Sequence, residues 1–346
     1  MAHSTIGDVA RLAGVSTSSV SNLLNGRSAR MRPATRDRIQ KAIVQLGYTP
    51  NQAARQLKTG HSSIIGLIVP SVANPFFGLF ARHVEEAALS HGYQVLLGNS
   101  DRDPRRECNY AEELWGSGVR GIIFGTSLGH YRHLDELISK GMHIIAFDQS
   151  KEPDLAGPID CIGVDNIQAT RLLTKHIMAL GHRRIGFVSG PISTVSRKDR
   201  LLGYRQSLEE GKVEYDPRLV WEGVSDNFGD TSTIKLGRQG AHDLLSLQDP
   251  PTAIIAINDM YAFGVYAGAR DLGISIPDEV SVAGIDNLPL TEIVVPALTT
   301  IQQPIKEIAL LAVRRLIDKI EGPQDVAPTH QILPPELIVR ASTAPA

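Results

Sequence analysis

The hydrophobic pattern of the chain changes its period near residue 60. Before that point apolar residues recur three and four positions apart, as on one face of a helix, most clearly at Ile39, Ala42, Ile43 and Leu46. After it, short apolar runs rich in β-branched residues alternate with amphipathic stretches, which is typical of a parallel sheet with helices between its strands. The pattern predicts a small all-α segment followed by a larger α/β body.

The all-α segment has start and stop signals for three short helices, predicted over residues 6–13, 17–24 and 33–46. Thr5 and Ser16 are placed to cap the first and second helices, and Gly14 to make the turn between them. Pro33 suits the first turn of the third helix, and Gly47 suits its end. Two short helices joined by a tight turn indicate a helix-turn-helix.

The α/β body contains two series of predicted strands, which implies two lobes. Ile65–Val69 and Ile185–Ser189 open the two series with similar residues, 120 positions apart. The first series is Ile64–Val69, Gln94–Gly98, Gly121–Phe124, His143–Phe147 and Cys161–Val164, and the second is Arg184–Ser189, Leu219–Glu222, Ala253–Ile257 and Val280–Gly284.

Composition is that of a folded protein, with 42% hydrophobic and 21% charged residues. The first residues lack the basic and apolar regions of a signal peptide, and no apolar run is long enough for a membrane span, so we expect a cytoplasmic protein. Cys108 and Cys161 stand far apart without metal-ligand spacing, and we expect both to be inert packing residues.

Charge is distributed unevenly between the two parts. Residues 1–60 contain nine Lys and Arg against Asp8 and Asp37, a net charge of +7, so the other 286 residues sum to −9 within a total of −2. A small basic segment on a larger acidic body is the pattern expected of a DNA-binding module joined to another domain. A basic tail that only aids solubility is the alternative, and the three-helix pattern excludes it.

The first fifty residues resemble the lactose and galactose repressor (LacI/GalR) family of bacterial transcription regulators. The resemblance is carried by Thr5–Ser16 (TIGDVARLAGVS), Val20–Ser21, Asn25–Gly26 and Leu46–Asn51 (LGYTPN), and it continues to about Arg340. It implies a helix-turn-helix headpiece (residues 1–49), a hinge helix and linker (50–60), and a periplasmic-binding-protein-like effector and dimerisation domain (61–346). Its first lobe would comprise about 61–161 and 303–331, and its second about 162–302 and 332–342, with chain crossings near 160–163, 300–303 and 331–333.

DNA contacts follow from this layout. The second helix of a helix-turn-helix enters the major groove, so exposed residues Thr17, Ser18 and Asn22 are the candidates for base contacts. The resemblance implies phosphate contacts for Thr5, Ser16, Ser21, Asn25 and Thr35. It also implies a hinge helix that inserts Leu57 into the minor groove, with Ala54 and Lys58 beside it. A plain linker that docks on its own core is the alternative for the hinge.

An effector site is expected at the carboxyl ends of the strands, where parallel sheets bind ligands. Asp148, Asn258 and Asp286 follow predicted strands, and their carboxylate and amide groups suit a polyol or sugar. The resemblance adds Phe76, Phe77, Ser196, Arg200 and Gln303. Either Phe is alternatively lobe core, and Arg197 and Lys198 are either a solvated helix face or part of a site for an acidic or phosphorylated ligand.

These observations favour a DNA-binding repressor controlled by a small-molecule effector, expected to be a sugar or phosphosugar, acting as a homodimer on a pseudo-palindromic operator without a cofactor or metal. An enzyme is the second hypothesis, but no GxGxxG, P-loop, GxSxG or HExxH motif is present, and His130 and His133 lack further metal ligands and are expected on the surface. A sugar-transport protein is the third, and the headpiece and missing signal peptide oppose it.

Overall fold

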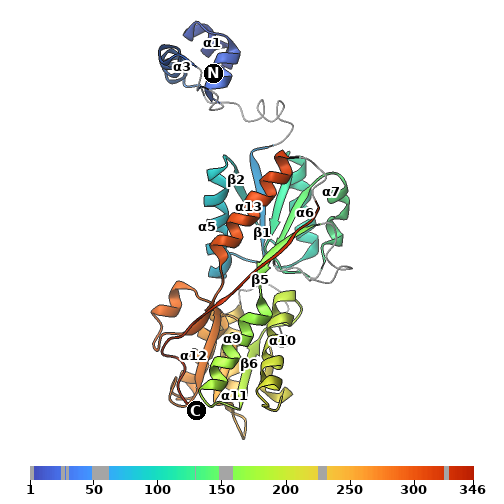
Figure 1. The fold of residues 1–346 in the computed structure, drawn as a ribbon, viewed down its shortest axis with the longest axis vertical. Helices are drawn as coiled ribbons and strands as arrows, with labels where there is room; N and C mark the ends of the chain where they lie inside the picture. The colour runs from blue at the N-terminus through green and yellow to red at the C-terminus, as the bar shows by residue number, and fades with distance from the viewer. Residues whose placement is uncertain are drawn as a thin grey trace. The chain divides into compact units, whose positions relative to one another are not determined.

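A computed structural model of the 346-residue chain describes residues 4–24, 28, 31–48, 62–128, 130–147, 159–224, 232–322 and 327–346. The chain divides into two compact units, Met1–Ser62 and Ser63–Ala346, which we call the headpiece and the body. No helix in the described ranges is long and apolar enough to cross a membrane. Figure 1 shows the elements of both units.

The headpiece contains the three predicted helices, α1 (Ile6–Ala13), α2 (Thr17–Leu24) and α3 (Pro33–Leu46). Thr5 and Asp8 form a reciprocal capping box at the start of α1, and the hydrogen bonds from Thr5 hold the pKa of the Asp8 carboxyl below its usual value. Gly14 and Gly47 end α1 and α3 in the left-handed conformation that a residue without a Cβ adopts most easily.

One small core holds these helices together. Val9 from α1, Val20 from α2 and Ile39 from α3 are all fully buried, and Ala10, Ala13 and Ala42 allow the helices to approach closely. The predicted apolar face of α3 therefore points inward, and the side chains of Thr17, Ser18 and Asn22 on α2 remain exposed.

The body consists of two six-stranded sheets, one in each lobe. The order in the first lobe is β11-β5-β4-β3-β1-β2, with every neighbouring pair parallel, from β1 (Ile64–Val69), β2 (Gln94–Asn99), β3 (Gly121–Phe124), β4 (His143–Phe147), β5 (Asp160–Val164) and β11 (His330–Leu333). The order in the second is β12-β10-β9-β8-β6-β7, with only the β12 pairing antiparallel, from β6 (Ile185–Ser189), β7 (Val220–Glu222), β8 (Ala253–Ala256), β9 (Ser281–Asp286), β10 (Thr299–Gln302) and β12 (Glu336–Ile338).

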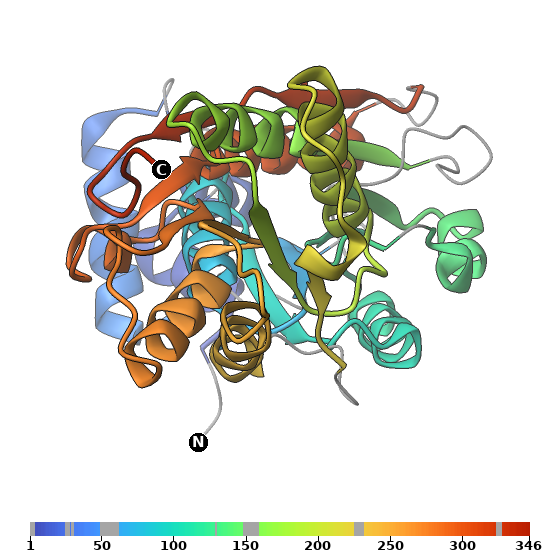
Figure 2. The same cartoon turned by 90° about the horizontal axis from the view of Figure 1, so that it is seen from below.

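Helices cover both faces of each sheet. The first lobe contributes α5 (Pro75–Ser90), α6 (Pro104–Gly116), η1 (Arg132–Leu134), α7 (Asp135–Ser139) and α13 (Ile305–Glu321). The second contributes α9 (Asn166–Ala179), α10 (Val195–Glu210), η2 (Pro217–Leu219), α11 (Thr233–Leu245), α12 (Asp259–Asp271) and η4 (Pro289–Glu292). Figure 2, which shows the same ribbon from below, shows these helices on both sides of the strands of the body.

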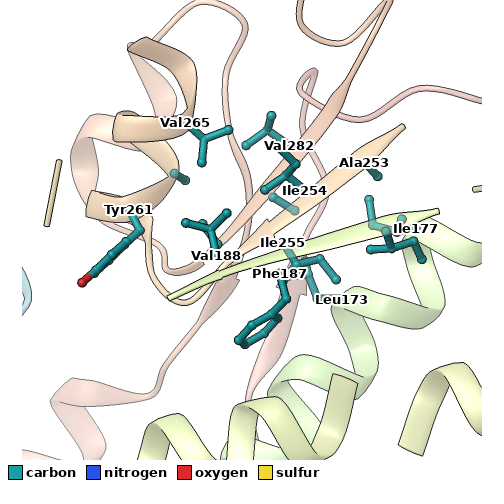
Figure 3. Packing of buried hydrophobic residues seen from close by; sticks show 14 of the residues in the cluster. Leu173, Ile177, Phe187, Val188, Ala253, Ile254, Ile255, Tyr261, Val265 and Val282 are labelled. Atoms are coloured by element: carbon teal, nitrogen blue, oxygen red, sulfur yellow. The ribbon is translucent and has the colours of Figure 1, made fainter. Parts of the chain in front are cut away.

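Successive side chains of a strand point to opposite faces of the sheet, and this alternation divides the core of the first lobe into two clusters. Ile123 of β3 packs with residues of α5 and α13, whereas its neighbours Ile122 and Phe124 pack with residues of α6 and α7. This is the two-residue period of a strand buried on both faces. In the second lobe Leu173 and Ile177 of α9 and Val265 of α12 join Ile254 and Ile255 of β8 in one core cluster (Figure 3).

The chain crosses between the lobes three times, after β5, after β10 and after β11. All of β5 and β11 belong to the first sheet, so the first crossing follows Val164, one residue beyond the expected 160–163, and the third follows Leu333, at the end of the expected 331–333. The crossing segments 299–302, 330–333 and 336–338 are themselves strands, which the hydrophobic pattern did not predict.

His133 is not the free surface residue that the sequence suggested. Its Nε2 lies 2.9 Å from Oε2 of Glu107, a carboxylate that is fully buried on α6, and Ser100 Oγ donates to the other oxygen of Glu107 at 3.3 Å. Burial explains the pairing, because a carboxylate removed from water needs hydrogen-bond donors. The contact ties η1 to α6 within the first lobe.

Candidate functional site

A cavity lies between the lobes, where the carboxyl ends of the central strands of both sheets meet. In each sheet the strand order reverses direction beside the first strand, at β1 in the first lobe and β6 in the second. The loops that follow neighbouring strands diverge at such a point and leave room for a ligand.

Seven of the eight effector residues expected from the sequence line this cavity: Phe76, Phe77, Ser196, Arg200, Asn258, Asp286 and Gln303. The eighth, Asp148, lies outside the described residues. The cavity is also lined by Asn74, Arg102, Gly125, Ser127, Phe147, Arg197 and Ile257.

The second lobe holds its polar lining residues in fixed orientations. Arg200 on α10 donates from Nε to Asn166 Oδ1 at 2.8 Å and from Nη1 to the carbonyl oxygen of Ile257 at 2.7 Å. Asn258 caps α12, and its Oδ1 accepts from the backbone N–H of Tyr261 at 3.1 Å. Held at two of its donor atoms, the guanidinium group has little rotational freedom and is preorganised to bind an oxygen of a ligand.

Asp286 and Gln303 form a second polar pair. Gln303 Nε2 donates to Asp286 Oδ1 at 2.7 Å, and both side chains are buried. Below them is the fully buried Asp259, whose carboxylate accepts from Thr300 Oγ1 at 2.6 Å and from the backbone N–H of Leu288 at 2.9 Å. Burial raises the pKa of Asp259 to about 6.

The first lobe contributes an aromatic wall. Asn74 caps α5 by accepting from the N–H of Phe76, and the ring centroids of Phe76 and Phe77 lie 5.2 Å apart in an edge-to-face arrangement. Both rings belong to the core of the lobe and also line the cavity, so the two alternatives considered for them both apply. Aromatic faces of this kind pack well against the C–H groups of a sugar ring.

Direct hydrogen bonds join the lobes at one edge of the cavity. Ser127, in the loop after β3, donates from Oγ to Ser196 Oγ at 3.1 Å and accepts the N–H of Ser196 at 3.2 Å, and the Ser127 carbonyl oxygen accepts the N–H of Val195 at 3.2 Å. Ser127 has a φ of 55°, a left-handed conformation that is uncommon for a residue with a side chain. The contact holds the lobes close together.

The cavity between the closed lobes is small, at about 50 Å³. One water takes up about 30 Å³, and pockets for small organic ligands are typically about 300 to 1,000 Å³. A sugar-sized ligand therefore needs the lobes to separate, or the lining side chains to move, before it can enter.

The sequence missed several cavity residues for identifiable reasons. Arg102 and Ser127 follow β2 and β3, at the same kind of strand end as Asp286, so the rule that selected Asp286 also applied to them. The solvated-face interpretation is wrong for Arg197, which is 8% exposed and donates to the Pro191 carbonyl oxygen at 2.9 Å, and it fits Lys198, which is exposed. The reason is helical spacing: Arg197 stands three residues before Arg200 and shares its face of α10.

On the headpiece, α2 presents the three base-contact candidates Thr17, Ser18 and Asn22 on its exposed surface. Short polar side chains at the start of a helix leave its backbone accessible to a nucleic acid. Asn22 has an amide that can donate and accept at once, as the edge of an adenine requires.

The phosphate-contact candidates have different surroundings. Thr5 is exposed but is engaged in the capping box of α1, and Ser16 Oγ accepts the N–H of Ser19 at 3.2 Å at the start of α2. Ser21 and Thr35 are half-buried. Asn25 and the hinge residues Ala54, Leu57 and Lys58 lie outside the described residues.

Known proteins match both parts of the chain. Residues 5–51 match the family "Bacterial regulatory proteins, lacI family", and residues 174–343 match a "Periplasmic binding protein-like domain". The chain is 36% identical over 344 residues to the "HTH-type transcriptional regulator DegA" of Bacillus subtilis (strain 168), covering 99% of this chain and 98% of that protein.

Solved structures of transcription regulators are similar as well. A lac repressor dimer bound to operator and the anti-inducer ONPF has a TM-score of 0.83 and 26% identity, over 99% of this chain and 100% of that one. A complex of the transcriptional regulator CelR with cellobiose has a TM-score of 0.70 and 28% identity, over 98% and 99%. The family and the fold class expected from the sequence are thereby confirmed, and the chain belongs to the lacI family of bacterial transcription regulators.

Proposed function

We propose that this protein is a sequence-specific DNA-binding repressor whose affinity for its operator is controlled by a small molecule bound between the lobes of the body, and that it has no enzymatic role. One observation carries the proposal: a single chain joins a helix-turn-helix with an exposed polar second helix to a two-lobed body with a polar cavity between its lobes. Such a protein acts where the chromosome is, in the bacterial cytoplasm.

The DNA-binding part of the proposal assigns base contacts to Thr17, Ser18 and Asn22. Phosphate contacts are assigned to Thr5, Ser16, Ser21, Asn25 and Thr35, and minor-groove contacts to Ala54, Leu57 and Lys58. The excess of nine basic over two acidic residues in the first 60 supplies the attraction to the phosphate backbone.

The effector is proposed to be a sugar or sugar derivative. The CelR structure contains cellobiose, and the cavity of this chain combines an aromatic wall with a guanidinium, a carboxylate and an amide, the groups that bind a hydroxylated ring. The contacts are assigned to Phe76, Phe77, Asp148, Ser196, Arg200, Asn258, Asp286 and Gln303.

The active form is proposed to be a homodimer, as in the lac repressor structure. Exposed apolar residues support a self-association surface: Leu96 and Leu97 on the edge strand β2, with Leu89 on the neighbouring α5, in the first lobe, and Ile293 and Val295 in the second. A two-fold dimer reads a pseudo-palindromic operator.

Regulation follows from linkage. A ligand changes operator affinity only to the extent that it binds the two lobe arrangements with different affinity. The hydrogen bonds between Ser127 and Ser196 stabilise one arrangement, and a ligand in the cavity beside them changes its population.

Selection of the purified full-length protein against a random double-stranded DNA pool tests the proposal. We expect a pseudo-palindrome, with binding to it weakened by about 5- to 150-fold in Asn22→Ala and specificity lost at one position of each half-site, because a bidentate base contact contributes about 1–3 kcal/mol. Gln45→Ala, at an exposed position on α3, is the matched control and should bind normally. Enrichment of no sequence, with binding that depends only on ionic strength, would contradict the proposal.

A further inference from the structure

Helix α2 has five side chains with a hydroxyl or amide group, and the structure divides them into two sets. Ser19 Oγ is hydrogen-bonded at the start of the helix, and Ser21 is half-buried. Thr17, Ser18 and Asn22 are exposed, and their side chains make no hydrogen bond to another described residue. These three side chains are therefore the polar groups that α2 can offer to a base pair.

The helix carries no charge. Its eight residues, Thr17–Leu24 (TSSVSNLL), include no Lys, Arg, Asp or Glu. In the described part of the headpiece the charged side chains are on α1 and on or beside α3, where Arg11 pairs with Asp8 and Lys41 pairs with Asp37. Attraction to phosphates therefore comes from outside α2, and the helix can distinguish base pairs only through neutral groups.

The exposed polar side chains share one face of α2. At about 100° per residue, positions 17, 18 and 22 fall within about 140° of the helix circumference. Val20 lies on another side of the helix and is fully buried in the headpiece core. The three side chains therefore point away from the core and can reach base pairs close to one another in the major groove.

Neutral groups of these types match the major-groove edge of an A·T pair. An asparagine amide accepts from N6 and donates to N7 of one adenine, whereas guanine presents two acceptors that are paired by arginine or lysine. A threonine methyl group packs against the methyl group of thymine, and a serine hydroxyl can serve either base pair. Thr17, Ser18 and Asn22 therefore suit an A·T pair and lack the cation that reads guanine.

We propose that the base pairs read by α2 in each half-site of the operator are A·T pairs. Asn22 binds the N6 and N7 atoms of an adenine, the methyl group of Thr17 packs against the methyl group of a thymine, and the helix makes no bidentate contact with guanine. The inference rests on the proposed operator binding, and it specifies the class of DNA sequence that the second helix recognises.

Base analogues in the operator test these contacts on the full-length protein. Selection from a random DNA pool gives the operator, and the pairs read by α2 are those at which selectivity relaxes in Thr17→Ala, Ser18→Ala or Asn22→Ala. We expect an A·T pair at each of them. 7-Deazaadenine lacks the N7 acceptor and uracil lacks the thymine methyl group, so each analogue removes one proposed contact and leaves the protein unchanged.

The adenine contact is measured with 7-deazaadenine at the base pair assigned to Asn22. The wild type should bind this operator about 2- to 13-fold more weakly than the unmodified one, as expected for the loss of one hydrogen bond. Asn22→Ala should bind the two operators equally. Asn22→Arg adds the guanidinium that reads guanine, and its preference at this base pair should change from adenine to guanine by about 5- to 150-fold.

The methyl contact is measured with uracil in place of thymine at the base pair assigned to Thr17. The wild type should bind about fourfold more weakly for each half-site changed, the factor for one buried methyl group. Thr17→Ser lacks the side-chain methyl group and should not distinguish uracil from thymine. Thr17→Val, the matched control, keeps a methyl group and should keep the preference for thymine.

A G·C pair at the position assigned to Asn22, or equal wild-type affinity for thymine and uracil at every pair read by α2, would overturn the inference. So would loss of the thymine preference in Thr17→Val with its retention in Thr17→Ser. Each of these results leaves the regulator intact, because the protein has still bound a specific operator. Enrichment of no sequence by the wild type refutes the proposed function and this inference with it.

Discussion

Replacing Ile39 with alanine should unfold the headpiece and leave the body intact. Ile39 is fully buried on α3 between Val9 of α1 and Val20 of α2, in the one core cluster that the headpiece has within its described residues. At about 0.05–0.15 kcal/mol per residue, a unit that spans Met1–Ser62 has a free energy of unfolding of about 3–9 kcal/mol. Truncating a buried Ile to Ala costs about 2–5 kcal/mol.

A loss of about 3 kcal/mol lowers the folded-to-unfolded ratio of the headpiece about 100-fold, enough to abolish operator binding in a marginal domain. The body belongs to a separate compact unit and should keep its stability. Val44→Ala is the control: Val44 is on the same helix but 81% exposed, and a surface substitution changes stability by less than about 0.5 kcal/mol.

Two probes follow the units separately. Both tryptophans, Trp115 and Trp221, are in the body, so tryptophan fluorescence during urea unfolding reports on the body alone. Hydrogen exchange of peptides from α3, read by mass spectrometry, reports on the headpiece. A shift of the fluorescence midpoint in Ile39→Ala would show that the two units unfold together, and unchanged exchange in α3 would show that the core does not hold the headpiece.

Two further predictions concern the body. Because burial raises the pKa of Asp259 from 3.8 to about 6, the folded state binds its proton more tightly than the unfolded state, and the free energy of unfolding should fall by about 2 kcal/mol between pH 4 and pH 6 through this group. Urea titrations at several pH values in that range measure how steeply the free energy of unfolding depends on pH. This dependence should be weaker in Asp259→Asn than in the wild type and unchanged in Asp278→Asn, a control at an exposed position. Equal dependence in the wild type and both variants would refute the raised pKa of Asp259. In Gly237→Ala the new Cβ would lie 2.2 Å from the Tyr261 carbonyl oxygen, so α11 and α12 must separate and the thermal midpoint of unfolding should fall by the equivalent of about 1–3 kcal/mol. Gly116→Ala is the control and should not lower the midpoint, because a Cβ at Gly116 would meet no atom within 4 Å. Equal midpoints in the two variants would refute the close packing of α11 against α12.

Local signals were sufficient to predict the headpiece. Thr5 and Ser16 stand directly before α1 and α2, Pro33 begins α3, and α1 and α3 end at Gly14 and Gly47, so each of these signals acts within one turn of chain. The strands of the body were predicted for a similar reason, because burial on both faces leaves continuous apolar runs such as Ile64–Val69. The strands at the crossings were missed, since Thr299–Gln302 and His330–Leu333 are short and partly polar and owe their structure to pairing with distant strands.

The cavity shows where sequence reasoning ends. The rule that ligands collect at strand ends selected Asp286 and Asn258, because it needs only the position of a residue relative to its own strand. It could not show that Arg102, Arg197 and Arg200 face one small space, because that depends on how two lobes, with residues about 100 positions apart, come together. The chemistry of the ligand is set by this convergence. A carboxylate and an amide at strand ends indicate a polyol, but the three guanidinium groups that line the same cavity come from different lobes, and they are recognised as one group only once the two lobes are seen together.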